Sequence, residues 1–134
     1  LVRRLCPECA ESYEPTEAEI RAIGLDPDVV LRGSGPDGPR FRRPRGCRAC
    51  EGTGYLGRVA LYEMMGMDAA IRDMTFRGAA HGDVRRTALA SGALRPLLAD
   101  GARKVTEGVT SVTEVLRVVG SSVASSEEEA ALSA

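Results

Sequence analysis

Two short stretches decide how this sequence folds: Cys6-Pro7-Glu8-Cys9 and Cys47-Arg48-Ala49-Cys50. Each is a C-x2-C pair, and 37 residues separate the two pairs. A C-x2-C turn directs two thiols at one point, so two such turns supply the four sulfur ligands of a tetrahedral zinc site. We therefore expect one structural Zn²⁺ bound by Cys6, Cys9, Cys47 and Cys50, with no coordination position left open for catalysis.

Two other interpretations of the cysteines stay open at this point. A disulfide across two intervening residues closes a short loop and is usually redox-active, and the four thiols could also be buried without contact between them. The residues after the second pair favour the metal, because Gly52 and Gly54 allow the positive φ that a tight metal-binding turn needs. We predict that removal of the metal unfolds residues 6–58, since structural zinc contributes on the order of 10 kcal/mol to the folding of small domains.

The segments that flank the cysteines predict strands. Residues 1–5 form a short strand candidate, and the mostly apolar run 57–67 is typical of a strand buried on both faces. We expect these two strands to pair, with a zinc-binding lobe over residues 6–56 inserted between them. Two strands do not make an independent sheet, so the pair should belong to a larger sheet.

The second half of the sequence predicts a bundle of short helices over residues 68–120. Thr16 and Ser111 each begin a capping box, the first for a helix within the zinc lobe and the second for the last helix. Asp68 and Asp83 are predicted to cap two helices between them. Residues 121–134 are rich in Ser, Ala and Glu and predict a disordered tail. The fold class is therefore α+β.

Composition excludes several classes of function. The chain has 134 residues, 43% of them apolar, and a net charge of -1, so no overall field attracts nucleic acid. No apolar stretch has the length of a transmembrane helix. The phosphate-binding pattern G-x-x-x-x-G-K-[ST] is absent, because the one lysine, Lys104, precedes Val105. We identify no catalytic residue and no cofactor-binding residue.

Arginines gather around the second cysteine pair. Residues 32–58 contain seven arginines against two acidic residues, Asp37 and Glu51. Three interpretations remain: a solvated loop, a face that binds an acidic protein surface, or a nucleic-acid site, which the lack of interleaved aromatic residues disfavours. The candidate interaction face consists of Arg40, Arg42, Arg43, Arg45 and Arg48.

Four segments together resemble a known family. They are residues 1–9, 46–55, 57–63 and 100–111, and their order and spacing cover the chain from residue 1 to about residue 119. The sequence resembles the C-terminal portion of the secretion ATPases that power bacterial type II secretion and type IV pilus assembly. It departs from that pattern in three respects. The loop near residues 33–39 is longer, the Glu-containing tail is extra, and Ala102 and Pro96 stand where the family pattern leads us to expect a larger apolar residue and a small polar one.

The resemblance implies a fold and a setting. The two strands would be the remnant of a RecA-like ATPase sheet, and the four cysteines would bind zinc. The parent protein would be a cytoplasmic homo-hexamer, peripheral to the inner membrane, whose upstream core binds ATP and Mg²⁺. Its partners would be that core, neighbouring subunits and an inner-membrane platform protein, with no nucleic acid. The alternative is an autonomous zinc module, either a nucleic-acid-binding zinc ribbon or an Hsp40-like co-chaperone domain, although the latter needs four such repeats.

Overall fold

The computed structural model describes residues 1–33 and 41–120. Three small antiparallel sheets organise these residues, each made of two strands. They pair β1 (Val2–Leu5) with β4 (Tyr55–Val59), β2 (Glu11–Tyr13) with β3 (Phe41–Arg43), and β5 (Met64–Met65) with β6 (Leu94–Arg95). The α+β prediction is thus confirmed. The predicted tail, 121–134, and Arg40 lie outside the described residues.

Helices follow and interrupt these sheets. Between β2 and β3 lie α1 (Glu17–Ala22) and α2 (Pro27–Gly33), and a 3-10 turn, η1 (Arg48–Cys50), precedes β4. After β5 come α3 (Ala69–Phe76), α4 (His81–Ala90) and α5 (Leu97–Thr106), and the chain continues into a helix at 112–120. Within residues 1–33 and 41–120, none of these helices has the length and apolar content needed to cross a membrane.

The predicted pairing of the first strand with the apolar run 57–67 is confirmed by β1 and β4. The prediction that this run is one continuous strand, buried on both faces, is wrong. β4 ends at Val59 and β5 covers two residues, so no continuous strand fills 57–67. The break occurs where the Tyr62 N–H donates to the Asp100 carboxylate at 3.1 Å, instead of to a neighbouring strand. Tyr62 and Met64 are 60% and 65% exposed, so this segment is not buried on both faces as predicted.

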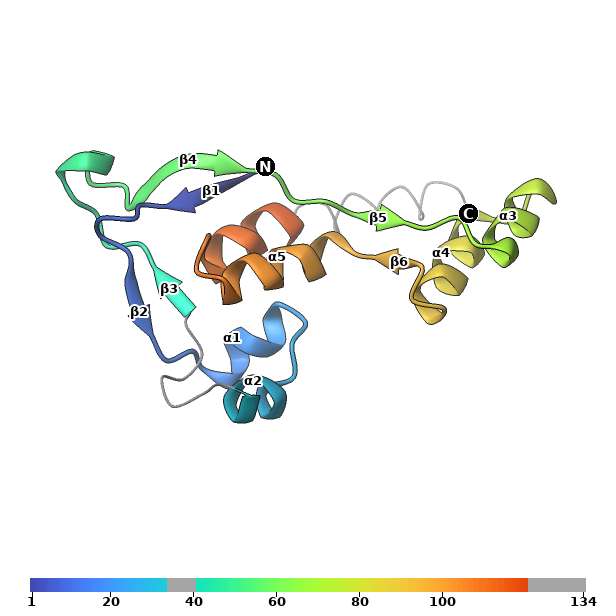
Figure 1. Ribbon diagram of the computed structural model, residues 1–134, viewed down its shortest axis with the longest axis horizontal. Helices are drawn as coiled ribbons and strands as arrows, with labels where there is room; N and C mark the ends of the chain where they lie inside the picture. Colours follow the sequence, from blue (N-terminus) through green and yellow to red (C-terminus); the bar gives the residue numbers. More distant parts are fainter. Residues whose placement is uncertain (34–40, 121–134) are drawn as a thin grey trace.

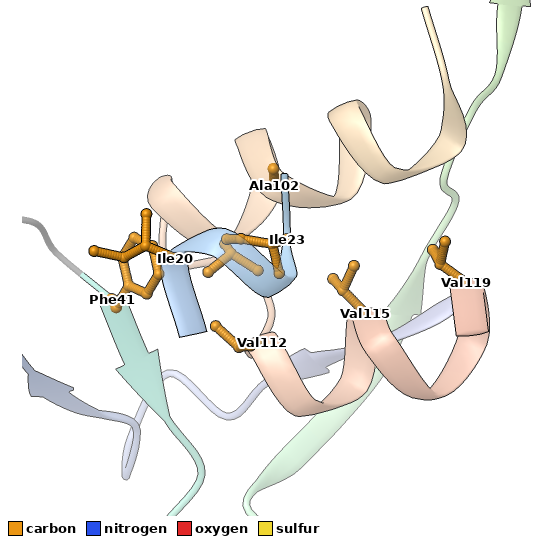
Figure 2. Packing of buried hydrophobic residues seen from close by; sticks show 8 residues of the cluster. Ile20, Ile23, Phe41, Ala102, Val112, Val115 and Val119 are labelled. Carbon is orange, nitrogen blue, oxygen red and sulfur yellow. The ribbon is translucent and has the colours of Figure 1, made fainter. Parts of the chain in front are cut away.

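The main core lies between the first helices and the last ones. Figure 2 shows Ile20, Ile23 and Phe41 facing Ala102 and three valines of the 112–120 helix. The valines are Val112, Val115 and Val119, all buried, as their i, i+3, i+7 spacing predicts. The last two helices approach closely at Gly101, where an added Cβ would lie 2.6 Å from Val115 Cγ1.

A second, smaller core lies at the far end of the molecule. Ile71 from α3, Ala88 from α4 and Leu94 from β6 form it, and β5 and β6 connect it to the rest of the chain (Figure 1). The predicted cap of α3 is confirmed, since Asp68 accepts the Ile71 N–H at 2.8 Å. The predicted cap of α4 is wrong: the helix begins at His81, so Asp83 lies inside its first turn, where its charge still complements the helix dipole.

The 112–120 helix is tied to β1 through Glu114. Ser111 makes its half of the predicted capping box, because its Oγ accepts the Glu114 N–H at 3.2 Å. The second hydrogen bond of a capping box, from the Ser111 backbone N–H to the Glu114 carboxylate, is not among the bonds of the described residues. That carboxylate accepts the Arg3 backbone N–H at 3.1 Å and bonds from the guanidinium groups of Arg3 and Arg117, with both Nη2 atoms at 2.7 Å. We call this group of three side chains, Arg3, Glu114 and Arg117, the Glu114 clamp.

Candidate metal centre

The four cysteines come together at one end of the molecule. Cys6 directly follows β1, and the turn to Cys9 closes with the Ala10 N–H donating to the Cys6 carbonyl at 3.0 Å. Cys47 and Cys50 are held by η1, where the Gly52 N–H donates to the Cys47 carbonyl at 2.9 Å. Pairing of β1 with β4 sets the two turns against each other, because Cys6 donates its N–H to the Gly54 carbonyl at 2.9 Å.

The sulfur positions fit a tetrahedral ion. All four Sγ atoms lie within 4.8 Å of one another. The Cys47–Cys50, Cys9–Cys50 and Cys6–Cys47 sulfur pairs are 3.7, 3.8 and 3.9 Å apart. Four sulfurs bound ~2.3 Å from a central zinc ion would be about 3.8 Å apart. All four cysteines are free, and a disulfide would require about 2.05 Å. The four cysteines are therefore positioned to bind a metal.

Two glycines make the second turn tight enough for this geometry. Gly46 and Gly54 have φ of +100° and +74°. A Cβ at Gly46 would lie 2.5 Å from the Gly52 carbonyl oxygen, and one at Gly54 would lie 2.4 Å from the Cβ of Pro44. Each position therefore excludes a side chain for two independent reasons, the backbone conformation and the lack of space. The need for Gly54 follows from the sequence pattern, whereas the role of Gly46 is seen in the structure.

Backbone donors surround Cys50. The N–H groups of Cys47 and Gly54 lie 3.2 and 3.1 Å from its sulfur. Burial acts to raise the pKa of Cys50, but these bonds outweigh it and lower the pKa to about 6. Burial raises the pKa of Cys9 to about 11, and bonding with the neighbouring sulfurs adds to this rise. A divalent cation would favour the thiolate form of all four sulfurs, so this donor set suits a soft metal ion.

The arginines of the candidate interaction face differ in whether they have a partner within the chain. Arg42 is half-buried and donates to the Ala10 carbonyl at 2.9 Å. Arg43 and Arg45 both pair with Glu11, at 3.6 and 3.3 Å. These three side chains therefore brace β2, β3 and the turn that precedes the second cysteine pair.

Arg48, by contrast, is exposed and forms no ion pair with any residue in the described part of the chain. The sequence does not reveal the role of Glu11, because it lies more than 30 positions away from its partners and no local motif links them.

The family model and the relatives described here point to the same family. The family model described as "Type II/IV secretion system protein" matches residues 1–117. The chain is 42% identical over 118 residues to the Type II secretion system protein E of Pseudomonas aeruginosa, which covers 88% of the chain and 22% of the relative.

Two pilus proteins match over similar lengths. The Type IV pilus assembly ATPase TfpB of Acinetobacter baylyi is 35% identical over 119 residues, which is 89% of the chain and 19% of the relative. The Type IV pilus assembly ATPase PilB of Thermus thermophilus is 33% identical over 116 residues, which is 87% of the chain and 12% of the relative. The chain spans about a fifth of the length of these curated relatives, or less.

Proposed function

Because this chain belongs to the type II/IV secretion system protein family, we propose that it forms the C-terminal, zinc-binding and helical part of a motor ATPase for protein secretion or pilus assembly. Of the three relatives described above, two are named pilus assembly ATPases and one is named a type II secretion system protein, so both systems remain candidates. The observation that carries the proposal is the cluster of four cysteine sulfurs within the matched region.

In this proposal the metal is structural zinc. Cys6, Cys9, Cys47 and Cys50 would hold it with four sulfur ligands, which leaves no position for a substrate or a reactive water. The bound ion would fix the turn after β1 to the turn before β4. Between these two turns, the described residues 10–33 and 41–46 fold back onto α5 and the 112–120 helix through Phe41 and α1.

Nucleotide chemistry would reside in the rest of the protein. The sequence has no phosphate-binding loop, so we infer that this chain alone does not hydrolyse ATP and that ATP with Mg²⁺ binds the upstream core. The parent protein would act as a homo-hexamer in the cytoplasm, docked at the inner membrane. Its partners would be the ATPase core, neighbouring subunits and an inner-membrane platform protein.

The role of the chain in such a motor would be mechanical. The Glu114 clamp and the metal centre both fasten β1, one at each end of the strand, so the zinc lobe and the C-terminal helices would move with that strand as one unit. Motion of the ATPase core would then be relayed to the platform protein or to the neighbouring subunit. Arg48 is the best placed residue of the candidate face for an acidic partner, because Arg43 and Arg45 already pair with Glu11.

Metal analysis of the purified chain tests the core of the proposal. We expect one zinc per chain by mass spectrometry, its loss in Cys50→Ser, and unfolding of the lobe when a chelator is added, measured by circular dichroism. Ser12→Ala, at an exposed position of β2, is the matched control and should keep its zinc. One equivalent of iron, or a thermal midpoint that a chelator does not change, would contradict a structural zinc site.

Function is tested in the full-length protein. Charge reversal at Arg48 should reduce secretion or piliation while the purified protein keeps its ATPase rate, since the arginine would bind a partner and not nucleotide. Charge reversal at Arg21, which pairs with Glu17 on α1, controls for a general effect of added negative charge. Wild-type secretion and piliation in the Arg48 variant would remove this face from the proposal.

A further inference from the structure

A shallow pocket lies beside the Glu114 clamp, away from the metal centre. Its volume is about 260 Å³, and it is lined by Leu1, Val2, Arg3, Arg58, Glu114 and Arg117. Three guanidinium groups thus line the pocket with a single carboxylate. The pocket carries an excess of two positive charges, which is notable in a chain whose net charge is -1.

The clamp holds two of these guanidinium groups in place and leaves part of each unused. Arg3 and Arg117 both donate from Nε and Nη2 to the Glu114 carboxylate. Within the described residues, Nη1 of neither side chain makes a hydrogen bond. Arg3 is fixed further by its position over the Tyr55 ring, with Cζ 4.1 Å from the centroid. Two oriented pairs of N–H donors are therefore available without the entropy cost of ordering a free arginine.

Arg58 adds a third positive charge that has no counter-ion in the described part of the chain. It lies directly opposite Arg3 in the register of β1 and β4, and its side chain is exposed. Like charges directly opposite each other destabilise an antiparallel pair. Among the described residues that line the pocket, Glu114 is the one acidic side chain, and it is hydrogen-bonded to Arg3 and Arg117 and not to Arg58. An anion in the pocket would relieve this repulsion.

We propose that the pocket bounded by Arg3, Arg58 and Arg117 binds a phosphate group. The Nη1 groups of Arg3 and Arg117 can each donate to one phosphate oxygen, and the planar guanidinium fork of Arg58 matches the spacing of two. Donors from three side chains around one pocket favour phosphate over a single carboxylate, which presents fewer oxygens. A phosphate carries about -1.5 to -2 charge at neutral pH, which balances the excess of the pocket. The group could belong to free inorganic phosphate or to a nucleotide, and both present the same chemistry. Phosphate binding in this pocket requires neither the metal centre nor the proposed motor role.

Calorimetric titration of the 134-residue chain with inorganic phosphate, at low ionic strength, tests the proposal. We expect saturable 1:1 binding that Arg58→Gln weakens about tenfold or more, since this removes charged hydrogen bonds. Arg58 lies outside the Glu114 clamp, so Arg58→Gln should keep the wild-type circular dichroism spectrum and thermal midpoint. If Arg58→Gln does not fold, Arg58→Lys is the second test: it keeps the charge but loses the planar fork, and it should also weaken phosphate binding. Arg72→Gln, which removes the same charge from α3, should bind like the wild type.

A second titration with ATP separates the two sources of phosphate. Tighter binding of ATP with the same dependence on Arg58 identifies a nucleotide phosphate, and affinity no higher than that of inorganic phosphate identifies the free ion. Either result supports the site. Absence of saturable binding with both ligands, or equal weakening by Arg58→Gln and Arg72→Gln, would overturn it.

Discussion

Replacement of Glu114 by glutamine should reduce the stability of the whole chain. The Glu114 side chain has no solvent exposure, while those of Arg3 and Arg117 are 46% and 59% exposed. Bonds from Arg117 and then Arg3 lower the pKa of Glu114 from 4.5 to about 2, against the effect of burial. Glutamine keeps the shape but removes the charge, and it turns an N–H₂ group toward donors.

The size of the effect follows from that pKa. A pKa lowered by roughly 2.5 corresponds to about 3 kcal/mol, at about 1.4 kcal/mol for each pH unit. Both arginines can return to solvent in the variant, which recovers part of this energy. We therefore expect Glu114→Gln to lower the free energy of unfolding by about 2–3 kcal/mol at pH 7.

The pH dependence provides a sharper check than the size alone. A carboxyl whose pKa is lowered on folding adds stability above its unfolded pKa, and this stability is lost as the pH falls through the folded value. The difference between wild type and Glu114→Gln should therefore be constant above about pH 5 and shrink toward pH 2. Both proteins have the same cysteines, so loss of metal in acid affects both and cancels in the difference.

Urea unfolding followed by circular dichroism at 222 nm measures this difference. Glu17→Gln is the matched control, because Glu17 pairs with Arg21 on the exposed face of α1 and should change stability by less than about 0.5 kcal/mol. A cost for Glu114→Gln as small as that of the control would refute the reasoning. So would a large cost that stays the same from pH 7 to pH 3, because packing and not charge would then be its origin.

Three further substitutions test single contacts. Gly54→Ala places a Cβ 2.4 Å from Pro44 Cβ at a positive φ, so we expect weaker metal binding in competition with a chelator; unchanged affinity would contradict the need for glycine. Gly101→Ala places a Cβ 2.6 Å from Val115 Cγ1 and should cost about 1–3 kcal/mol in urea unfolding, whereas a gain in stability would show that the helices separate freely. Asp68→Ala removes the cap of α3 and should cost about 1 kcal/mol, visible as faster amide exchange confined to the second core; uniform exchange across the chain would count against a local effect.

Features that depend on local geometry could be predicted from the sequence. The C-x2-C spacing brings sulfurs together within each turn, and strand pairing needs only to join the two turns, so the cluster of Cys6, Cys9, Cys47 and Cys50 was predictable. The capping box at Thr16 is confirmed for the same reason, because all of its bonds join residues three positions apart. The i, i+3, i+4, i+7 spacing of Val112, Val115, Leu116 and Val119 is likewise typical of one face of a helix, and the three valines are buried while Leu116 is partly buried.

Features that depend on distant residues could not be predicted. The apolar run at 57–67 has the composition of a buried strand, but burial depends on what covers it, and Asp100 takes the N–H of Tyr62 instead. The sequence around Glu114 indicates a capping box, and nothing in it indicates that Arg3 would take the carboxylate. The same limit applies to Asp83, because α4 begins three residues earlier than an Asp83 cap predicts, at His81, and without a side-chain cap.

The position of β1 in the chain has a consequence for folding during synthesis. Arg3 and Glu114 are 111 residues apart. At a synthesis rate of roughly 5–20 residues per second, Glu114 is therefore added about 6–20 s after Arg3 of β1. Cys6 and Cys47 are 41 residues apart, so the metal turns can meet after about 2–8 s. The ion would thus join the two cysteine turns well before the ribosome has supplied the helix that carries Glu114. With zinc as the proposed ion, its supply during translation should therefore affect the yield of folded protein more strongly than zinc added after release.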